Sequence, residues 1–171
     1  IRDYYASRGL GDVYKRQWLF CYSCIVVLLL LFVFQIFSNN IKKVHHYFFT
    51  LPPDDKYIHY TMNKAMYLVD ETGLAQYNTL KEKGFYSNIL GTSAVFSIYC
   101  DSIAFDKSKM EFTYYGRQRI ERRSNILMRE LITAGQLKRV PRTENNPHGL
   151  LIVNWRTLLN KDIEQKTKTT Y

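Results

Sequence analysis

The stretch that decides the fold is residues 110–121, MEFTYYGRQRIE. Apolar side chains alternate along it with polar ones: Met110, Phe112, Tyr114 and Ile120 face one way, and Glu111, Thr113, Arg117, Arg119 and Glu121 face the other. A period of two is typical of a half-buried antiparallel strand, with one side toward a core and one toward water. The stretch therefore predicts an antiparallel sheet with an open face.

Three further strands are predicted around this one. Phe96, Ile98 and Cys100 share one face of a preceding strand, which ends at the charged turn 106–109. A third strand is expected over residues 126–140, and a fourth over 150–159 after a polar loop. The positions expected to face the core are almost wholly apolar.

Helical patterns precede the strands. The end of one helix is expected over residues 41–50, closed by Pro52, and Asp54 and Asp55 supply capping charge for a second. Gly73 is expected to interrupt the chain before a short third helix, and Gly84 to stop it. Helices followed by strands predict an α+β fold, with helices packed on one face of a curved antiparallel sheet. The 134 residues 38–171 suffice for one such domain.

Residues 18–37, from Trp18 to Phe37, read WLFCYSCIVVLLLLFVFQIF and carry no charged side chain. As a helix they would extend about 30 Å, the thickness of a bilayer's hydrocarbon core. A cleaved signal peptide has a shorter apolar stretch and a small-residue cleavage site, and a buried core helix is seldom apolar all round for this length. We predict a retained transmembrane anchor, within which Cys21 and Cys24 are small lipid-facing side chains.

Residues 1–17 are expected to be an artefact, because DVYKRQ at 12–17 resembles the translation of a transposase-type sequencing adapter. The alternative is an ordinary cytoplasmic tail. Setting the segment aside removes a net +2 from the formal charge of +9 and leaves +7 on the rest. Lys42 and Lys43 alone would favour a cytoplasmic C-terminal part. However, orientation is inferred by comparing Lys and Arg on the two flanks of the span, and the N-terminal flank is expected not to be native.

The chain shows no motif that calls for catalysis. None of the four His has zinc-like spacing to Cys or carboxylates, and Gly-rich phosphate loops, GxSxG turns and HExxH helices are absent from the sequence. We therefore predict no enzyme activity, no catalytic or metal-ligating residue and no cofactor.

A basic group could contact phosphates, and it consists of Arg117, Arg119, Arg122 and Arg123, extended by Arg129, Lys138, Arg139 and Arg142. Glu121 and Glu130 interrupt the charge, and Tyr115 is the one aromatic residue expected on the face of Arg117 and Arg119. Direct nucleic-acid binding is therefore not favoured, and an acidic protein partner or membrane headgroups remain equal alternatives. The most distinctive loop is TENNPHG at 143–149, where Pro147 fixes φ and Gly149 permits a tight turn.

The soluble part resembles the conjugative transposon TraK family of Bacteroidetes across about residues 44–163. The matching segments, in order, are HYFFTL at 46–51 followed by Pro53 and Asp54, EKGFY at 82–86, CDSI at 100–103, YGRQ at 115–118 with RSN at 123–125, and NNPHG at 145–149. The sequence departs from the family where only residues 38–44 separate the apolar span from the first of these segments. The TraK family looks like the counterpart of the VirB-type bitopic inner-membrane assembly protein of type IV secretion systems, whose NPxG motif is matched here by Asn146, Pro147 and Gly149.

This resemblance implies a periplasmic cone-shaped domain similar to nuclear transport factor 2, anchored by a single span in the bacterial inner membrane. It implies a scaffold for other secretion-channel subunits in conjugative DNA transfer, with weak homodimerisation. The contact residues we predict are Asn146, Pro147 and Gly149 in the loop and Tyr115, Arg117 and Arg119 on the open face of the sheet. The alternatives are a nucleic-acid-contacting channel protein and a small-molecule-binding cone-fold protein.

Overall fold

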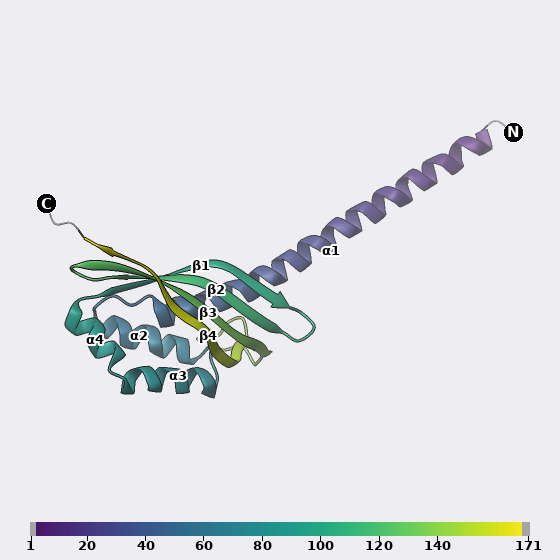
Figure 1. Cartoon of the computed structure of the whole chain (residues 1–171). Coiled ribbons are helices and arrows are strands. Elements are labelled where there is room, and N and C mark those ends of the chain that lie inside the picture. The colour runs from purple at the N-terminus through teal and green to yellow at the C-terminus, as the bar shows by residue number, and fades with distance from the viewer. Residues whose placement is uncertain (1–2, 169–171) are drawn as a thin grey trace. The chain divides into compact units, whose positions relative to one another are not determined.

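The computed structural model describes residues 3–168, with side chains described for Tyr22 and for residues 24–168 (Figure 1). Its elements, in order, are α1 (Asp3–Phe49), α2 (Asp55–Met66), α3 (Glu71–Glu82), α4 (Phe85–Thr92), β1 (Val95–Asp106), β2 (Glu111–Glu121), β3 (Asn125–Arg139) and β4 (Leu150–Thr167). The chain divides into two compact units, Ile1–Ile36 and Phe37–Tyr171. Of the stretch predicted to be an adapter artefact, residues 1–2 and all side chains lie outside what is described.

The four strands form one antiparallel sheet in the order β1-β2-β3-β4, so each strand pairs with its neighbour in sequence. In β2 the even-numbered residues from Phe112 to Ile120 are buried, and the odd-numbered ones are exposed or half-buried. The β1–β2 register shifts between Cys100 and Ser102, which leaves Asp101 as a bulge in an edge strand. Helices α2, α3 and α4 lie on one side of the sheet (Figure 1). The predicted α+β class, with helices against an antiparallel sheet, is confirmed.

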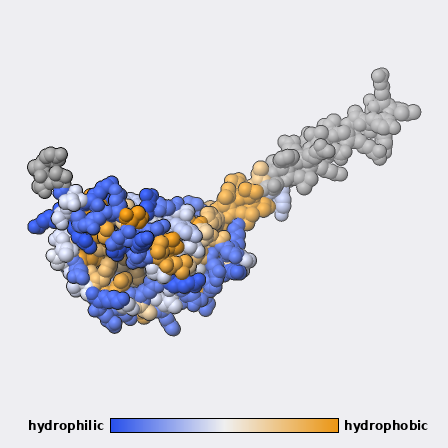
Figure 2. Space-filling view, viewed as in Figure 1, coloured by the Kyte–Doolittle hydropathy of each residue, from blue (hydrophilic) through white to orange (hydrophobic). Residues whose placement is uncertain are grey.

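Helix α1 contributes to both units. Among the described residues, one helical segment, Cys24–Phe49, is long and apolar enough to cross a membrane, with a mean hydropathy of 2.3 in its most apolar window. Its side chains from Ile25 to Val33 are mostly exposed, and they form the orange stretch in Figure 2, whereas the surface of the second unit is largely blue. After Ile36 the same helix becomes part of a protein core, so a membrane could contain only the part before Phe37.

The core lies between the sheet and the helices. From α1 it takes Phe37, Ile41, Val44 and Phe48, which recur at helical spacing and are 8% exposed or less. Together with Trp155 and the buried side chains of β2, these residues form the apolar layer that holds α1 against the sheet. At roughly 2 kcal/mol for each fully buried large apolar side chain, this layer is a main source of stability.

Two predictions about the helices need correction. Gly73 does not interrupt the chain but lies within α3, because the helix already begins at Glu71, where Asp70 accepts a hydrogen bond from the Thr72 backbone N–H at 2.9 Å. Helix α4 was not predicted at all. By contrast, Asp54 caps α2 as expected, accepting hydrogen bonds from the N–H groups of Lys56 and Tyr57.

Two strand boundaries also differ from the prediction. Met110 lies in the β1–β2 turn with φ at 54°, and β2 begins at Glu111. The fourth strand continues to Thr167, eight residues beyond its predicted end at Leu159. The extension is exposed and, apart from Ile163, polar, so it has no core-facing alternation to reveal it. Backbone pairing with the first residues of β3 holds it in place.

Candidate functional site

The open side of the sheet, which we call the outer face, carries three predicted contact residues. Tyr115, Arg117 and Arg119 occupy consecutive odd positions of β2, while the even positions between them face the core. Tyr115 is 39% exposed, and the side chains of Arg117 and Arg119 are 55% and 33% exposed. The structure therefore brings these three side chains together on one accessible surface.

Both arginines of the outer face are already paired with carboxylates. Arg117 donates to Asp101, the bulge residue of β1, from Nε at 3.0 Å and from Nη2 at 2.7 Å. This two-pronged contact raises the pKa of Arg117 through hydrogen bonding and charge. Arg119 pairs with Glu121, which also accepts a hydrogen bond from Lys168 at 2.7 Å. Lys168 and then Arg119 hold the pKa of Glu121 below its usual value.

Aromatic, charged and aliphatic side chains are mixed across the outer face. Tyr115 stands opposite Ser102 of β1 and Ile132 of β3, whereas Arg117 stands opposite Tyr99 and Glu130. Tyrosine and arginine are enriched in protein interfaces because they combine large contact area with directional hydrogen bonds. A surface of tyrosines and charge-balanced arginines suits a protein partner better than a phosphate backbone, which requires an excess of positive charge.

The predicted contact loop is built differently, because Asn146 is buried. Its side chain accepts from the Leu150 N–H at 3.2 Å and donates to the Leu150 carbonyl at 3.0 Å and the Tyr67 carbonyl at 3.4 Å. These bonds join the loop to the start of β4 and to the residue that caps α2. Asn146 is 3% exposed and is hydrogen-bonded to backbone groups, which indicates that it fixes the backbone of the loop.

Gly149 closes the turn that Asn146 begins. Its N–H donates to the Asn146 carbonyl at 3.1 Å, its carbonyl accepts from Val140 at 2.9 Å, and its φ is 61°. A Cβ at this position would lie 2.5 Å from the Val140 carbonyl oxygen, so only glycine fits without strain. Between the two buried residues, Pro147 and His148 are exposed and form the accessible tip.

The loop and the outer face are separate surfaces. Ile132, which pairs with Tyr115, lies seven residues before the end of β3, or about 23 Å along the strand. The loop also contacts the helix side of the sheet, where Lys64 of α2 donates to Asn145 at 3.1 Å. The six predicted contact residues therefore divide into an exposed group on β2 and a loop whose exposed part is its tip.

The basic group noted in the sequence is also divided. Arg117 and Arg119 lie on the outer face, whereas Arg122 and Arg129 line a cavity on the side of the sheet that faces the helices. The group is therefore not one continuous patch along which a nucleic-acid backbone could run, and this weakens the nucleic-acid alternative.

The helix-covered side is less apolar than predicted. His45 of α1 is fully buried, stacks on Tyr114 with ring centroids 3.7 Å apart, and donates from Nδ1 to the Ile41 carbonyl at 2.7 Å. That tautomer leaves Nε2 to accept from the Thr133 hydroxyl at 2.6 Å. Burial lowers the pKa of His45 to about 4, although the hydrogen bond to Ile41 opposes the shift. The expectation of an almost wholly apolar inner side is wrong at His45, Thr133 and Gln118.

Sequence reasoning missed Asp101 as the partner of Arg117 and the inward direction of two arginines, whereas Glu121 was already expected on the face of Arg119. Arg122 follows Ile120 by two residues, so the alternation of β2, continued by one step, would have placed it on the inner side. Asp101 carried no such signal, because its position depends on a bulge that shifts the register of β1. Among the side chains that the structure describes, no group of three or more His, Cys, Asp or Glu is arranged to hold a metal ion.

With this geometry in view, two solved structures can be compared with the chain. TraE protein, solved in complex with 2-(2-furyl)isonicotinic acid, matches with a TM-score of 0.60 at 14% identity, covering 73% of this chain and 96% of TraE. VirB8 protein of Agrobacterium tumefaciens matches with a TM-score of 0.56 at 8% identity, covering 78% of this chain and 92% of VirB8. The chain has a VirB8-like fold.

The match to VirB8 confirms the fold that the sequence resemblance implied, the cone shared with nuclear transport factor 2. No protein-family model and no curated protein sequence matches the chain. The TM-scores of 0.60 and 0.56 establish a common fold. At identities of 14% and 8%, the roles of individual residues must be argued from this chain's own geometry.

Proposed function

We propose that the chain is a non-enzymatic assembly component of a conjugative type IV secretion apparatus, in which it scaffolds other channel subunits. The observation that carries the proposal is the VirB8-like fold on a helix whose preceding part is apolar enough to span a membrane. The TraK-like segments of the sequence support the same reading independently, because they point to the same class of bitopic assembly protein. Membership in the TraK family of conjugative transposons is part of the proposal.

The proposed organisation assigns residues 18–37 to a single inner-membrane span and residues 38–171 to a periplasmic assembly domain. Residues 1–17 are proposed not to belong to the native protein. The core position of Ile41 supports this division, because side chains needed in the folded unit are not free to face lipid. For the same reason the burial of Phe37 moves the end of the proposed span one residue earlier than predicted, to Ile36.

The proposed partner surface is the outer face around Tyr115, Arg117 and Arg119, with Pro147 and His148 at the loop tip as a second contact. Asn146 and Gly149 act in this scheme by shaping the tip rather than by touching a partner. A weak homodimer and the contacts to other channel subunits both use such surfaces, which combine exposed tyrosine with paired charges.

The test is gene deletion in the host bacterium, with the transfer frequency to a recipient as the readout. Deletion is expected to abolish transfer, and the wild-type chain supplied in trans to restore it. A fusion of a reporter active only in the periplasm to the C-terminal end is expected to be active. Undiminished transfer after deletion would refute the secretion role, and an inactive reporter on an expressed fusion would refute the orientation.

A further inference from the structure

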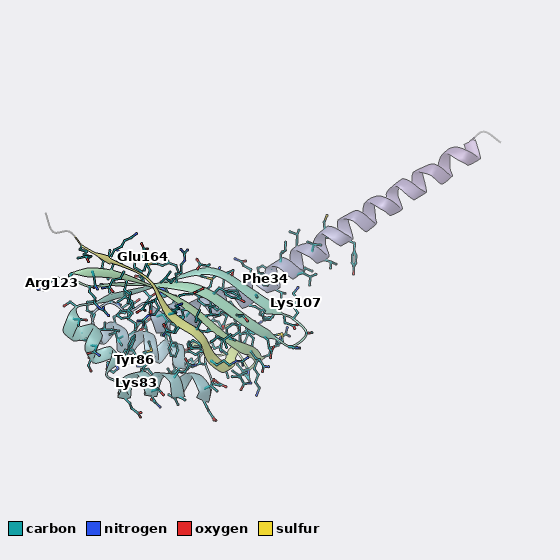
Figure 3. All side chains as sticks on the ribbon, in the orientation of Figure 1. Phe34, Lys83, Tyr86, Lys107, Arg123 and Glu164 are labelled. Carbon is teal, nitrogen blue, oxygen red and sulfur yellow. The ribbon has the colours of Figure 1, made fainter. Side chains whose placement is uncertain are left out.

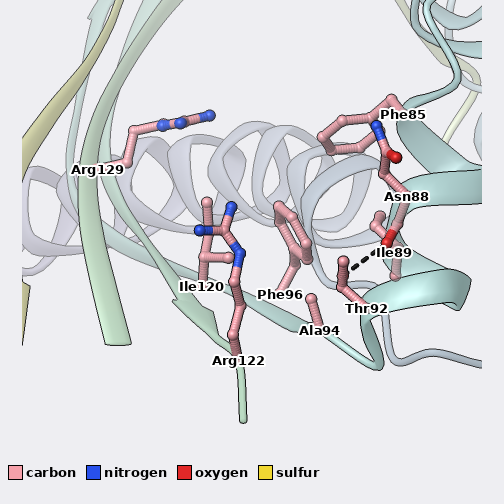
Figure 4. A pocket seen from close by; sticks show the side chains of 9 residues that line it. All are labelled: Phe85, Asn88, Ile89, Thr92, Ala94, Phe96, Ile120, Arg122 and Arg129. Atoms are coloured by element: carbon pink, nitrogen blue, oxygen red, sulfur yellow. Dashed lines mark hydrogen bonds between the residues drawn. The ribbon is translucent and has the colours of Figure 1, made fainter. Parts of the chain in front are cut away.

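The helix-covered side of the sheet has a cavity of about 320 Å³ at the end next to α4. Phe85 and Ile89 of α4 form one wall, and Phe96 and Ile120 of the sheet form another (Figure 4). The cavity is separate from the outer face and from the loop, and nothing in the proposed assembly role uses it.

Two arginines project into this apolar space. Arg122 follows the last residue of β2 and keeps the inward direction of Ile120, and Arg129 lies on β3 between the buried Leu127 and Leu131. Figure 4 shows the Arg129 side chain extending from β3 toward α4, with Arg122 rising beside Ile120. Guanidinium groups from two different strands thus share one cavity.

Their positive charge is only partly balanced. Asp162 accepts a hydrogen bond from Arg129 Nε at 2.6 Å, and no described side chain or backbone group is hydrogen-bonded to the two terminal nitrogens of Arg129. Arg122 has no carboxylate within 4.0 Å in the described part of the chain. No acidic residue lines the cavity. Guanidinium donors beside apolar walls, without an acidic lining residue, favour an anionic ligand.

We propose that this cavity binds a carboxylate attached to an aromatic or branched apolar group. A carboxylate matches the fork of guanidinium donors, and the attached group would pack against Phe85, Phe96 and Ile120. A volume near 320 Å³ is at the small end for ligand pockets and suits a single group of this kind. The same chemistry is offered by a free organic acid and by an acidic residue beside an aromatic one in a partner's peptide segment.

The test uses the full chain in nanodiscs of zwitterionic lipid and ligand-observed ¹⁹F NMR. The probes are N-acetyl-4-fluorophenylalanine, its uncharged amide, and the capped dipeptide acetyl-Glu-4-fluorophenylalanine amide, with empty nanodiscs as the baseline. We expect a carboxylate probe to bind at least about tenfold more tightly than the amide, as a charge-assisted hydrogen bond requires. Stronger binding of the free acid identifies a small-molecule source, and stronger binding of the dipeptide identifies a peptide source. Binding of neither above baseline overturns the proposal.

Matched variants locate the site. Arg122→Gln breaks no ion pair in the described structure and is expected to weaken binding at least about tenfold. Arg123→Gln removes the same charge from the exposed next residue, labelled in Figure 3, and is expected to leave binding unchanged. Equal effects of the two variants, or none from Arg122→Gln, would overturn the assignment.

A third variant keeps the charge and fills the space. Asn88 lies at the cavity wall on α4 and is exposed, so Asn88→Trp is expected to block the cavity without disturbing the core. Circular dichroism melting checks that each variant is folded. Undiminished binding to a folded Asn88→Trp chain would show that the probe binds elsewhere and would overturn the proposal.

Discussion

The two sides of the same sheet use polar residues in opposite ways. On the covered side, His45 and Thr133 are buried and bonded to each other, and the loop residue Asn146 is tied to two carbonyl groups of neighbouring elements. On the outer face, Arg117 and Arg119 are paired with carboxylates but remain in water. Substitutions of these buried, hydrogen-bonded residues should therefore change stability, and those of the outer-face arginines should change partner binding. The predictions below test this contrast from the largest effect on stability to the smallest.

Gly149→Arg is expected to have the largest effect. A side chain at φ 61° carries conformational strain, and its Cβ would meet the Val140 carbonyl oxygen at 2.5 Å. We expect a loss of about 3 kcal/mol in the free energy of unfolding, with a matching loss of assembly. The measurement is denaturant unfolding of the full chain in detergent.

The matched control is Gly91→Arg in α4, where a Cβ meets nothing within 4 Å and φ is not positive. This variant should unfold no more easily than the wild type, because glycine is the poorer helix former. A folded, transfer-competent Gly149→Arg chain would show that the loop does not depend on its glycine.

Acidification is expected to weaken the fold through His45. Its pKa is about 4 in the folded chain and near the ordinary 6.5 when unfolded, so below pH 6.5 the unfolded state binds the proton more readily. The free energy of unfolding should therefore fall as the pH drops from 6.5 to 4, by about 3 kcal/mol in total, and this contribution should level off below that range. Denaturant unfolding at a series of pH values measures it.

His45→Gln removes the titrating group and should flatten this part of the profile, whereas His148→Gln, at the exposed loop tip, should leave it intact. The difference between the two profiles separates His45 from carboxylates that titrate in the same range. Identical profiles of the two variants would mean that the pKa of His45 is not lowered in the folded chain.

Asn146→Asp tests whether the loop motif is structural. The carboxylate cannot donate to the carbonyls of Leu150 and Tyr67, and it places a charge in a buried position, so we expect a loss of about 2 kcal/mol. Asn145→Asp is the control, because its neighbour Lys64 already donates to the side-chain oxygen. If the two variants had the same free energy of unfolding, the buried hydrogen bonds of Asn146 would not explain why the loop has asparagine at this position.

The smallest effect on stability is expected from Arg117→Gln. The Arg117–Asp101 pair is solvent-exposed, so its loss should cost less than about 1 kcal/mol. The proposed partner surface predicts that transfer nonetheless falls at least about tenfold, as for an arginine at the centre of an interface. Lys107→Gln, in the exposed β1–β2 turn labelled in Figure 3, removes one charge and should leave transfer unchanged. Normal transfer with Arg117→Gln would remove this residue from the partner surface.

The alternation in β2 allowed both sides of the sheet to be predicted, because a strand with one buried face must repeat every two residues. The same rule fails where burial no longer distinguishes the two faces. Residues 160–167 of β4 are exposed on both sides and polar except for Ile163, and Arg122 and Arg129 face inward as charged residues because a cavity receives them. The motif around Asn146 was visible as a turn, but its buried hydrogen bonds include one to Tyr67, the C-cap of α2, which lies 79 residues away in sequence.

The bulge at Asp101 affects whether the edge strand β1 can pair with the edge strand of another copy of the chain. β1 is an edge strand. Its outer edge pairs with Leu51 at Phe96 and donates from the Ile98 N–H to the Thr50 hydroxyl, and among the described residues no strand pairs with that edge beyond these contacts. Copies anchored in a membrane, as proposed, would meet in two dimensions, which favours unwanted strand pairing between neighbours. An extra residue in the middle of β1, held in place by Arg117, breaks the regular spacing that a foreign strand would need. We therefore expect Asp101, which pairs with Arg117 on the outer face, also to hinder edge-to-edge pairing between copies.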